Sequence, residues 1–430
     1  MTMRSSKVAI VLLGGLTACA VSTISGGSGP TGNPDPGGAG NPDLGGAGNP
    51  GPDGAGNPGP GGEMCSDACI GGATKCSGTG LTTCARGADG CLAWTVPAAC
   101  SGRQTCSLGF CGDHGAWVGM SDMPEPRTFF GLATTADHLY AAGGENPIGP
   151  PQFSLASMDA YSFATGAWTS VAPMPASRSS FALMGGPDGR IYALGGHVPE
   201  AATTYCVGGI IPDCTWTLAW SPALAYSPAG NSWTSITQMP TLRLHMAGAV
   251  GHDGLLYTLG GGAGSKLMTV STVEAYNPRT NAWQGAAGMP TPRARLAAVT
   301  GPDGRIYALG GFTGEIYEGP GNPTGIVEAY TPSTNTWQSL ASMPTPRISF
   351  AAAVGIDGRI YAIGGTGPSG PVATVEAYSP ATNTWATVTS LPGVLINFAA
   401  ALGPSRQLLA VGGQRAPYGQ SLATVEAYTP

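Results

Sequence analysis

Five arginines recur at one fixed spacing, and by residue type they are the best candidates in this sequence for holding a charged ligand. Each follows the methionine of a Met-Pro pair by four positions: they are Arg127, Arg178, Arg243, Arg293 and Arg347. A guanidinium group can donate two parallel hydrogen bonds to a carboxylate, and several such groups around one opening would concentrate positive potential there. The arginines therefore predict a binding site for acidic sugars or acidic peptides.

A set of acidic residues with the same periodicity offers a second interpretation. Each precedes a recurring tyrosine by two positions: they are Asp159, Glu274, Glu328, Glu376 and Glu426. Arginines and carboxylates at matching positions could pair with each other and serve the fold alone. Leu224 replaces the acid in the second repeat and Leu395 replaces the arginine in the sixth, so pairing within a repeat fails twice. Both interpretations stay open.

The position two residues beyond each arginine varies in chemistry, while the residue after it is always apolar. The variable residues are Phe129, Ser180, His245, Arg295, Ser349 and Asn397. Such alternation is typical of a strand that buries one face. We predict that these six residues set ligand specificity.

Residues for metal or acid-base chemistry are few. The sequence has five histidines, of which His197 and His245 fall in neighbouring repeats. Two imidazoles without a third ligand make a weak case for a metal site. No metal and no other cofactor is therefore predicted.

All these positions belong to one repeated pattern. Short apolar segments end in Gly-Gly pairs that begin at Gly143, Gly195, Gly260, Gly310, Gly364 and Gly412. A tyrosine follows each pair, at Tyr161, Tyr226, Tyr276, Tyr330, Tyr378 and Tyr428. The first five tyrosines are followed seven residues later by Trp168, Trp233, Trp283, Trp337 and Trp385.

This pattern resembles the kelch repeat over residues 117–430, with about 52 residues in each unit. The resemblance implies an all-β fold, a six-bladed β-propeller in which each unit forms four antiparallel strands. In the fourth unit we expect strands over residues 294–300, 305–310 and 326–331, and a last strand that starts at Trp337.

The two ends of the repeated region fit together. The chain stops at Tyr428-Thr429-Pro430, before the sixth unit reaches its tryptophan strand, while an extra Trp117 precedes Met123 by six residues. We therefore expect an N-terminal strand to complete the last blade of a propeller domain over residues 114–430. Closure of this kind hides the strand edges that an open ring would leave exposed.

The kelch resemblance also implies where a ligand would bind. In kelch propellers, one set of loops joins the fourth strand of a blade to the first strand of the next, and another joins the second strand to the third. Both sets share one face around the central channel, which places the arginines and the variable residues there. The second unit adds an insertion with Cys206 and Cys214, together with Tyr205, Trp216 and Trp220. A disulfide-linked aromatic loop could act as a lid or stack on sugars, although a merely tolerated insertion is an equal alternative.

Two families of enzymes that are kelch propellers are similar to this sequence. Copper radical oxidases need a tyrosine linked to a free cysteine. Of the 11 cysteines here, ten follow Cys19, and this even number leaves no spare thiol. Sialic acid mutarotases use channel arginines and acidic side chains, which this chain has. We favour binding of an extracellular glycan or protein without catalysis, with a mutarotase-like enzyme as the alternative, and purely structural display as a third possibility.

Eight cysteines lie between the N-terminal region and the propeller, within residues 63–113. They are Cys65, Cys69, Cys76, Cys84, Cys91, Cys100, Cys106 and Cys111. They lack the paired Cys-x-x-Cys spacing of zinc sites, so we expect four disulfides in a small module of short hairpins rather than a zinc or iron-sulfur site. The sequence does not determine which cysteines pair.

The N-terminus has the features of an export signal. Arg4 and Lys7 precede the apolar run of residues 8–13, and the segment Leu-Thr-Ala-Cys ends at Cys19. It resembles the lipobox of bacterial lipoproteins, which implies a signal peptide over residues 1–18 and lipid attachment at Cys19; an ordinary secretory signal is the alternative. In residues 26–62, 24 of 37 positions are Gly or Pro, so residues 19–62 are expected to form a flexible linker with a reach of roughly 30 to 40 Å.

The composition limits the partners. Charged residues make up 10% of the 430 residues and the net charge is −6, which argues against binding nucleic acid through its phosphates. We expect a monomeric outer-membrane lipoprotein, on the surface or periplasmic face of the cell envelope, that contacts the membrane only through its lipid.

Overall fold

The computed structural model describes residues 74–77, 80–86, 92–95, 98–99, 105–107, 110–112, 115–146, 154–198, 219–264, 266–316, 322–403 and 406–430. They fall into two compact units, one within Gly26–His114 and one over Gly115–Pro430. The predicted signal peptide, Cys19, the linker and the Cys206–Cys214 loop lie outside the described residues. Within the described part of the chain, no helix has the length and apolar character needed to span a bilayer.

The smaller unit consists of short strands. Strand β2 (Gly80–Arg86) pairs with β1 (Thr74–Ser77), β3 (Leu92–Trp94) and β4 (Ala98–Ala99), and β5 (Thr105–Ser107) pairs with β6 (Phe110–Gly112). Cys84 is disulfide-bonded. The side chains of the other seven predicted disulfide cysteines of this region lie outside the described residues.

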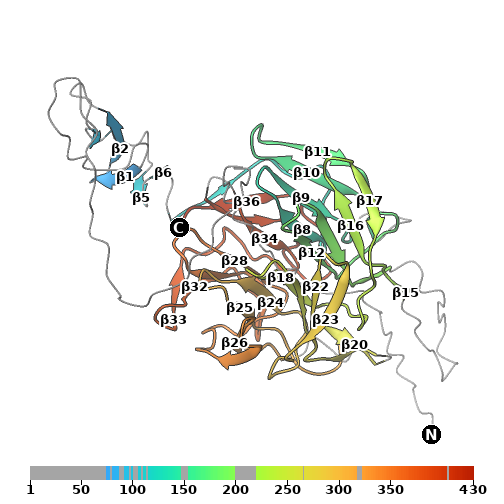
Figure 1. The fold of residues 1–430 in the computed structure, drawn as a ribbon. Helices are drawn as coiled ribbons and strands as arrows, with labels where there is room; N and C mark the ends of the chain where they lie inside the picture. Colours follow the sequence, from blue (N-terminus) through green and yellow to red (C-terminus); the bar gives the residue numbers. More distant parts are fainter. Residues whose placement is uncertain are drawn as a thin grey trace, which may run out of the picture. The chain divides into compact units, whose positions relative to one another are not determined.

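The larger unit is a six-bladed β-propeller, and every blade is a four-stranded antiparallel sheet (Figure 1). Blades 1 to 3 comprise β8 (Gly131–Thr134), β9 (His138–Ala142), β10 (Met158–Ser162) and β11 (Ala167–Val171); β12 (Ala182–Gly185), β13 (Ile191–Leu194), β16 (Leu224–Ser227) and β17 (Ser232–Ser235); and β18 (Ala247–Val250), β19 (Leu256–Leu259), β22 (Val273–Asn277) and β23 (Ala282–Ala286). Blades 4 to 6 comprise β24 (Ala297–Thr300), β25 (Ile306–Leu309), β26 (Val327–Thr331) and β27 (Thr336–Ser339); β28 (Ala351–Val354), β29 (Ile360–Ile363), β32 (Val375–Ser379) and β33 (Thr384–Val388); and β34 (Ala399–Leu402), β35 (Leu408–Val411), β36 (Val425–Tyr428) and β7 (Trp117–Gly119). The described connections between the second and third strands also contain three two-stranded hairpins: β14 (His197–Val198) with β15 (Ala219–Trp220), β20 (Gly262–Ala263) with β21 (Met268–Thr269), and β30 (Thr366–Gly367) with β31 (Gly370–Pro371).

The first strand of each blade lies nearest the axis. Strands β8, β12, β18, β24, β28 and β34 contact one another in that order and return to β8. Their residues are mostly small, as in Ala351–Val354 of β28. The crowding explains this choice: a Cβ atom added to Gly248 would lie 2.9 Å from the Cβ of Ala182 in the neighbouring blade.

The recurring tryptophans join each blade to the one before it. The indole Nε1 of Trp337 in blade 4 donates to the carbonyl of Ala287 at 2.7 Å, and the other described tryptophans of this pattern make the same contact. Trp117 makes it too, with Thr389 at 3.1 Å. This residue therefore occupies the position of a blade tryptophan although it lies at the other end of the domain's sequence.

Strand β7 pairs antiparallel with β36, which aligns Trp117 with Tyr428 and Gly119 with Glu426. The rings of Trp117 and Tyr428 stack with their centroids 5.1 Å apart. The sixth sheet thus takes one strand from the start of the domain and three from its end.

The expected strands of the fourth unit agree with β25, β26 and β27 to within one residue, but its first strand is shorter than expected. It starts at Ala297 rather than Ala294. Arg295 has a backbone φ of +53°, which no extended strand can accommodate. Ala294 instead forms an isolated bridge with Phe312.

Candidate ligand-binding site

The five recurring arginines lie inside the blades, with 0–1% of each residue exposed. Arg243 is typical: its Nη1 donates to the carbonyls of Gly260 and Thr272 at 2.7 and 2.9 Å, and its Nη2 donates to the Glu274 carboxylate at 2.8 Å. The equivalent ion pairs are Arg127 with Asp159 at 2.5 Å, Arg293 with Glu328 at 2.7 Å and Arg347 with Glu376 at 2.6 Å. Four arginines therefore pair with the carboxylate of their own blade.

Arg178 has no such acid, because Leu224 occupies that position. Its guanidinium donates instead to the carbonyls of Ala193 at 3.0 Å, Gly195 at 3.2 Å and Pro222. Burial lowers the pKa of Arg178 to about 9, so the group still carries its charge at neutral pH.

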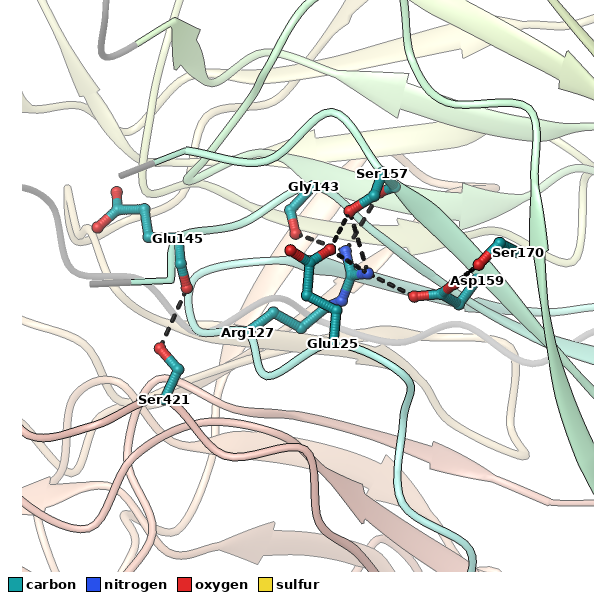
Figure 2. Close-up of polar contacts among 8 residues, drawn as sticks. All are labelled: Glu125, Arg127, Gly143, Glu145, Ser157, Asp159, Ser170 and Ser421. Carbon is teal, nitrogen blue, oxygen red and sulfur yellow. Dashed lines mark hydrogen bonds and ion pairs between the residues drawn. The ribbon is translucent and has the colours of Figure 1, made fainter. Parts of the chain in front are cut away.

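Figure 2 shows the network in the first blade. Arg127 donates to Asp159, to the Gly143 carbonyl at 2.9 Å and to Glu125 at 3.4 Å. Asp159 also accepts a hydrogen bond from Ser170 at 2.7 Å. Both carboxylate oxygens of Asp159 are therefore engaged by the fold.

These contacts correspond to one of the two interpretations that the sequence left open, in which the arginines pair with the recurring acidic residues of the third strands. Direct ligand contact by the arginines stays a prediction. Such contact would require a ligand carboxylate to displace protein groups already bonded to a buried guanidinium.

The six variable residues form a closed circle at the inner end of the blades. All six have a positive φ between +53° and +59°: they are Phe129, Ser180, His245, Arg295, Ser349 and Asn397. The backbone N–H of each donates to the carbonyl of its counterpart in the preceding blade, at distances of 3.0 to 3.3 Å. We call these residues the axial ring. The structure thus brings together all six residues at the position that varies among the repeats.

Several side chains of the axial ring are buried without a hydrogen-bond partner in the described structure. These atoms are Ser180 Oγ, Ser349 Oγ and both Oδ1 and Nδ2 of Asn397, in residues that are at most 1% exposed. A buried polar atom without a partner costs about 1 to 3 kcal/mol, and such atoms call for a specific explanation such as a bound molecule. The axial ring is therefore the candidate site.

A second circle of residues lies next to the axial ring, and the sequence analysis did not recognise it as a set. It contains the residue directly after each Gly-Gly pair: Glu145, His197, Gly262, Phe312, Thr366 and Gln414. Each forms a β-bridge with the residue that precedes an axial-ring member. The fixed offset from the Gly-Gly pair was a signal that could have identified them.

This second circle carries carboxyl, imidazole and amide side chains on one side and borders an apolar cluster on the other. Glu145, His197 and Gln414 belong to blades 1, 2 and 6, and Ser421 Oγ of blade 6 donates to the Glu145 carbonyl at 3.1 Å (Figure 2). On the side of blades 3 to 5, Phe312 packs in an apolar cluster with Leu244, Leu267, Ala294, Ile316 and Ile348. A ligand on this face would therefore meet two different kinds of surface.

Burial shifts the ionisable groups here toward their uncharged forms. It raises the pKa of Glu145 to about 8, an effect that the nearby Ser179 hydroxyl partly opposes. It lowers the pKa of His197 to about 4. Burial, followed by the charges of Arg295 and His197, holds the pKa of His245 well below its usual range.

The Kelch motif family model matches residues 126–175, 243–290, 293–344 and 347–392, which are four of the six blades. The propeller is built of kelch repeats. The chain is similar to Kelch-like protein 41 of Mus musculus, with 38% identity over 245 residues that make up 56% of this chain and 36% of that protein. It is also similar to Kelch-like protein terF of Aspergillus terreus, with 30% identity over 146 residues, which are 34% of this chain and 29% of that protein.

The match thus spans about a third of the length of these curated relatives. The solved structure of YjhT covers 72% of this chain and 97% of its own chain, with a TM-score of 0.57. At 16% identity, that likeness shows the fold alone.

The buried ion pairs of the kelch blades lead to a stability prediction. Glu376→Gln leaves the buried Arg347 charge without its carboxylate, and we expect it to lower the free energy of unfolding by about 3 to 5 kcal/mol. Asp303→Asn breaks the partly exposed Asp303–Arg305 pair and should cost at most about 1 kcal/mol. Thermal and urea unfolding of both variants measure the difference. Equal effects of the two substitutions would contradict a structural role of the buried pairs.

The shifted pKa values of Glu145 and His197 predict that the two residues change the protein's stability with pH in opposite directions. Between about pH 4.5 and pH 8 folded Glu145 retains a proton that the unfolded chain has lost, so its contribution to stability falls as pH rises. Between pH 6.5 and about pH 4 the unfolded chain binds a proton that folded His197 does not, so stability falls as pH falls. Glu145→Gln should remove the first loss and His197→Gln the second, in melting curves across this range. The exposed His252→Gln is the control, and a profile that neither site variant changes would refute these assignments.

Proposed function

We propose that this chain is an envelope-surface lipoprotein whose kelch propeller binds an extracellular glycan or protein ligand without catalysing a reaction. The signal sequence, Cys19 and the Gly/Pro-rich linker support anchoring at the outer membrane through lipid, with the protein facing the surface or the periplasm. We further propose that the protein is monomeric, contacts no nucleic acid, and needs no cofactor.

The observation that carries the binding proposal is the set of buried, unpartnered polar atoms in the axial ring. The backbone of these residues already satisfies the fold through the closed circle of hydrogen bonds. Their side chains add nothing to that circle, and glycine would adopt the same positive φ with less strain. Retaining Asn397 or Ser349 therefore costs stability, which is expected where a side chain serves a ligand.

A carbohydrate-active enzyme similar to sialic acid mutarotases is the alternative. It is favoured by the ionisable groups near the axial ring, because a protonated Glu145 and a neutral His197 at pH 7 could exchange protons with a sugar. A copper radical oxidase is a weaker alternative, since the cysteine count leaves no free thiol if all ten cysteines after Cys19 form disulfides.

Binding is tested with the full-length chain in detergent, screened against arrays of glycans and of envelope proteins. We expect saturable binding that Asn397→Gly abolishes, while the variant melts at or above the temperature of the parent. Asn335→Gly is the matched control, because Asn335 also has a positive φ of +54° but accepts hydrogen bonds from Ala287 and Tyr330. It should lower stability by about 1 kcal/mol and leave binding intact.

Two results would overturn this proposal. Binding that survives Asn397→Gly would place the ligand elsewhere on the molecule. Faster exchange between sugar anomers, followed by NMR, would favour the enzyme alternative.

Lipid anchoring is tested separately on whole cells. We expect Cys19→Ser to abolish ligand binding at the cell surface, and unchanged binding there would contradict lipid anchoring.

We also propose that β7 closes the propeller and thereby keeps the axial ring formed. Deleting residues 117–123 removes the fourth strand of blade 6 and the Trp117 hydrogen bond to blade 5, and leaves β36 with an unpaired edge. We expect this variant to lose cooperative unfolding. A deletion variant that melts like the parent would show that the ring closes without β7.

A further inference from the structure

The charge of the recurring arginines is already used within the protein. Four of them hold a carboxylate at 2.5 to 2.8 Å, and Arg178 is surrounded by backbone carbonyls. None is more than 1% exposed. An acidic ligand would gain little from the four paired guanidinium groups, because the neighbouring carboxylates cancel their field.

The unpartnered side-chain atoms of the axial ring favour a different kind of ligand. The side chain of Asn397 presents a donor and an acceptor, and the hydroxyls of Ser180 and Ser349 can each serve as either. A carboxylate only accepts hydrogen bonds, so it would leave the amide oxygen of Asn397 unsatisfied. A hydroxyl group both donates and accepts, and can therefore satisfy each of these atoms.

The ionisable groups near the axial ring reinforce this match. At neutral pH the shifted pKa values leave Glu145 protonated and His197 and His245 uncharged. Arg295 is the permanent charge of the ring, and its guanidinium lies over the Phe312 ring, 5.2 Å from the centroid. An arginine N–H group can donate to a hydroxyl oxygen as well as to an anion.

Apolar surface accompanies these polar atoms. Phe129 belongs to the axial ring and donates its backbone N–H to the carbonyl of Asn397 at 3.2 Å. A site that combines apolar side chains with a few directed polar atoms is typical for small ligands. The two faces of a sugar ring, with C–H groups and hydroxyls, suit such a combination.

We infer that the axial ring binds an uncharged, hydroxyl-bearing sugar unit, the end or a branch of a neutral glycan, with Asn397 and Ser349 as its specificity-determining residues. This inference rests on the proposed binding function and narrows it. It departs from the acidic ligand that the arginine spacing alone predicts.

The test compares sugars that differ in one group. Calorimetry on the full-length chain in detergent measures the affinities for glucose and glucuronate, and for galactose and galacturonate, at low and high salt. We expect at least one neutral sugar to bind about tenfold or more tightly than its acidic counterpart, and salt to leave that affinity unchanged. Asn397→Gly and Ser349→Gly should each lower it at least about tenfold, whereas Asn335→Gly should not.

Each other outcome counts against the inference in a distinct way. Tighter binding of a uronate, weakened by salt and lost in Arg295→Gln, would establish an acidic-sugar site. Failure of all four sugars, with array binding still sensitive to Asn397→Gly, would overturn the neutral-sugar inference and leave the binding function standing. Failure of both the sugars and the arrays would overturn the proposed function itself.

Discussion

The circle of six backbone hydrogen bonds in the axial ring is the constraint on which the rest of the propeller depends. It requires a positive φ at one residue of every blade, which ends the extended backbone there and starts the inner strand two residues later. Hydrogen bonds from the Gly-Gly pairs form another circle that supports it: the second glycine of each pair donates to the carbonyl at the recurring arginine position of the following blade. A Cβ atom on Gly311 would lie 2.7 Å from the Ala294 carbonyl, which explains why this position excludes other residues.

Because the backbone alone forms these circles, the circles do not depend on which side chain stands at each position, although the arginine side chains also form the buried ion pairs. Leu395 shows the principle, since its carbonyl accepts the usual hydrogen bond from Gly365 at 2.8 Å although it has no guanidinium group. In the axial ring the same freedom allows six different environments on six equivalent backbones. Variation among repeats is thus concentrated where a ligand can use it, and identity is concentrated where blades touch.

The repeated offsets in the sequence were sufficient to predict the propeller, the number of blades and most strands of the fourth blade, because these follow from local patterns that recur. The variable positions were identified for the same reason. The short first strand was not predicted, because the positive φ of Arg295 results from a hydrogen bond to the neighbouring blade. The shared polar side of Glu145, His197 and Gln414 was missed, because it arises only when the first and last blades become neighbours. The burial of the arginines likewise depends on how their blade folds over them.

The exceptions among the blades explain why the two sides of the site differ. Blade 2 keeps Arg178 but has Leu224 instead of an acid, and among the described residues the Arg178 guanidinium donates to carbonyl oxygens. Blade 6 has Leu395 and keeps Glu426, which is less buried than Glu376 of the preceding blade. These two blades flank blade 1, and the polar residues Glu145, His197 and Gln414 all come from these three. Blades 3 and 4 keep the regular ion pair and have Gly262 and Phe312 directly after their Gly-Gly pairs. Blade 1 also keeps its pair, between Arg127 and Asp159, but has Glu145 at this position and lies between the two blades in which the pair is broken. The carboxyl, imidazole and amide side chains at this position therefore lie in and between the blades that depart from the repeat, as expected if a ligand is held from that side.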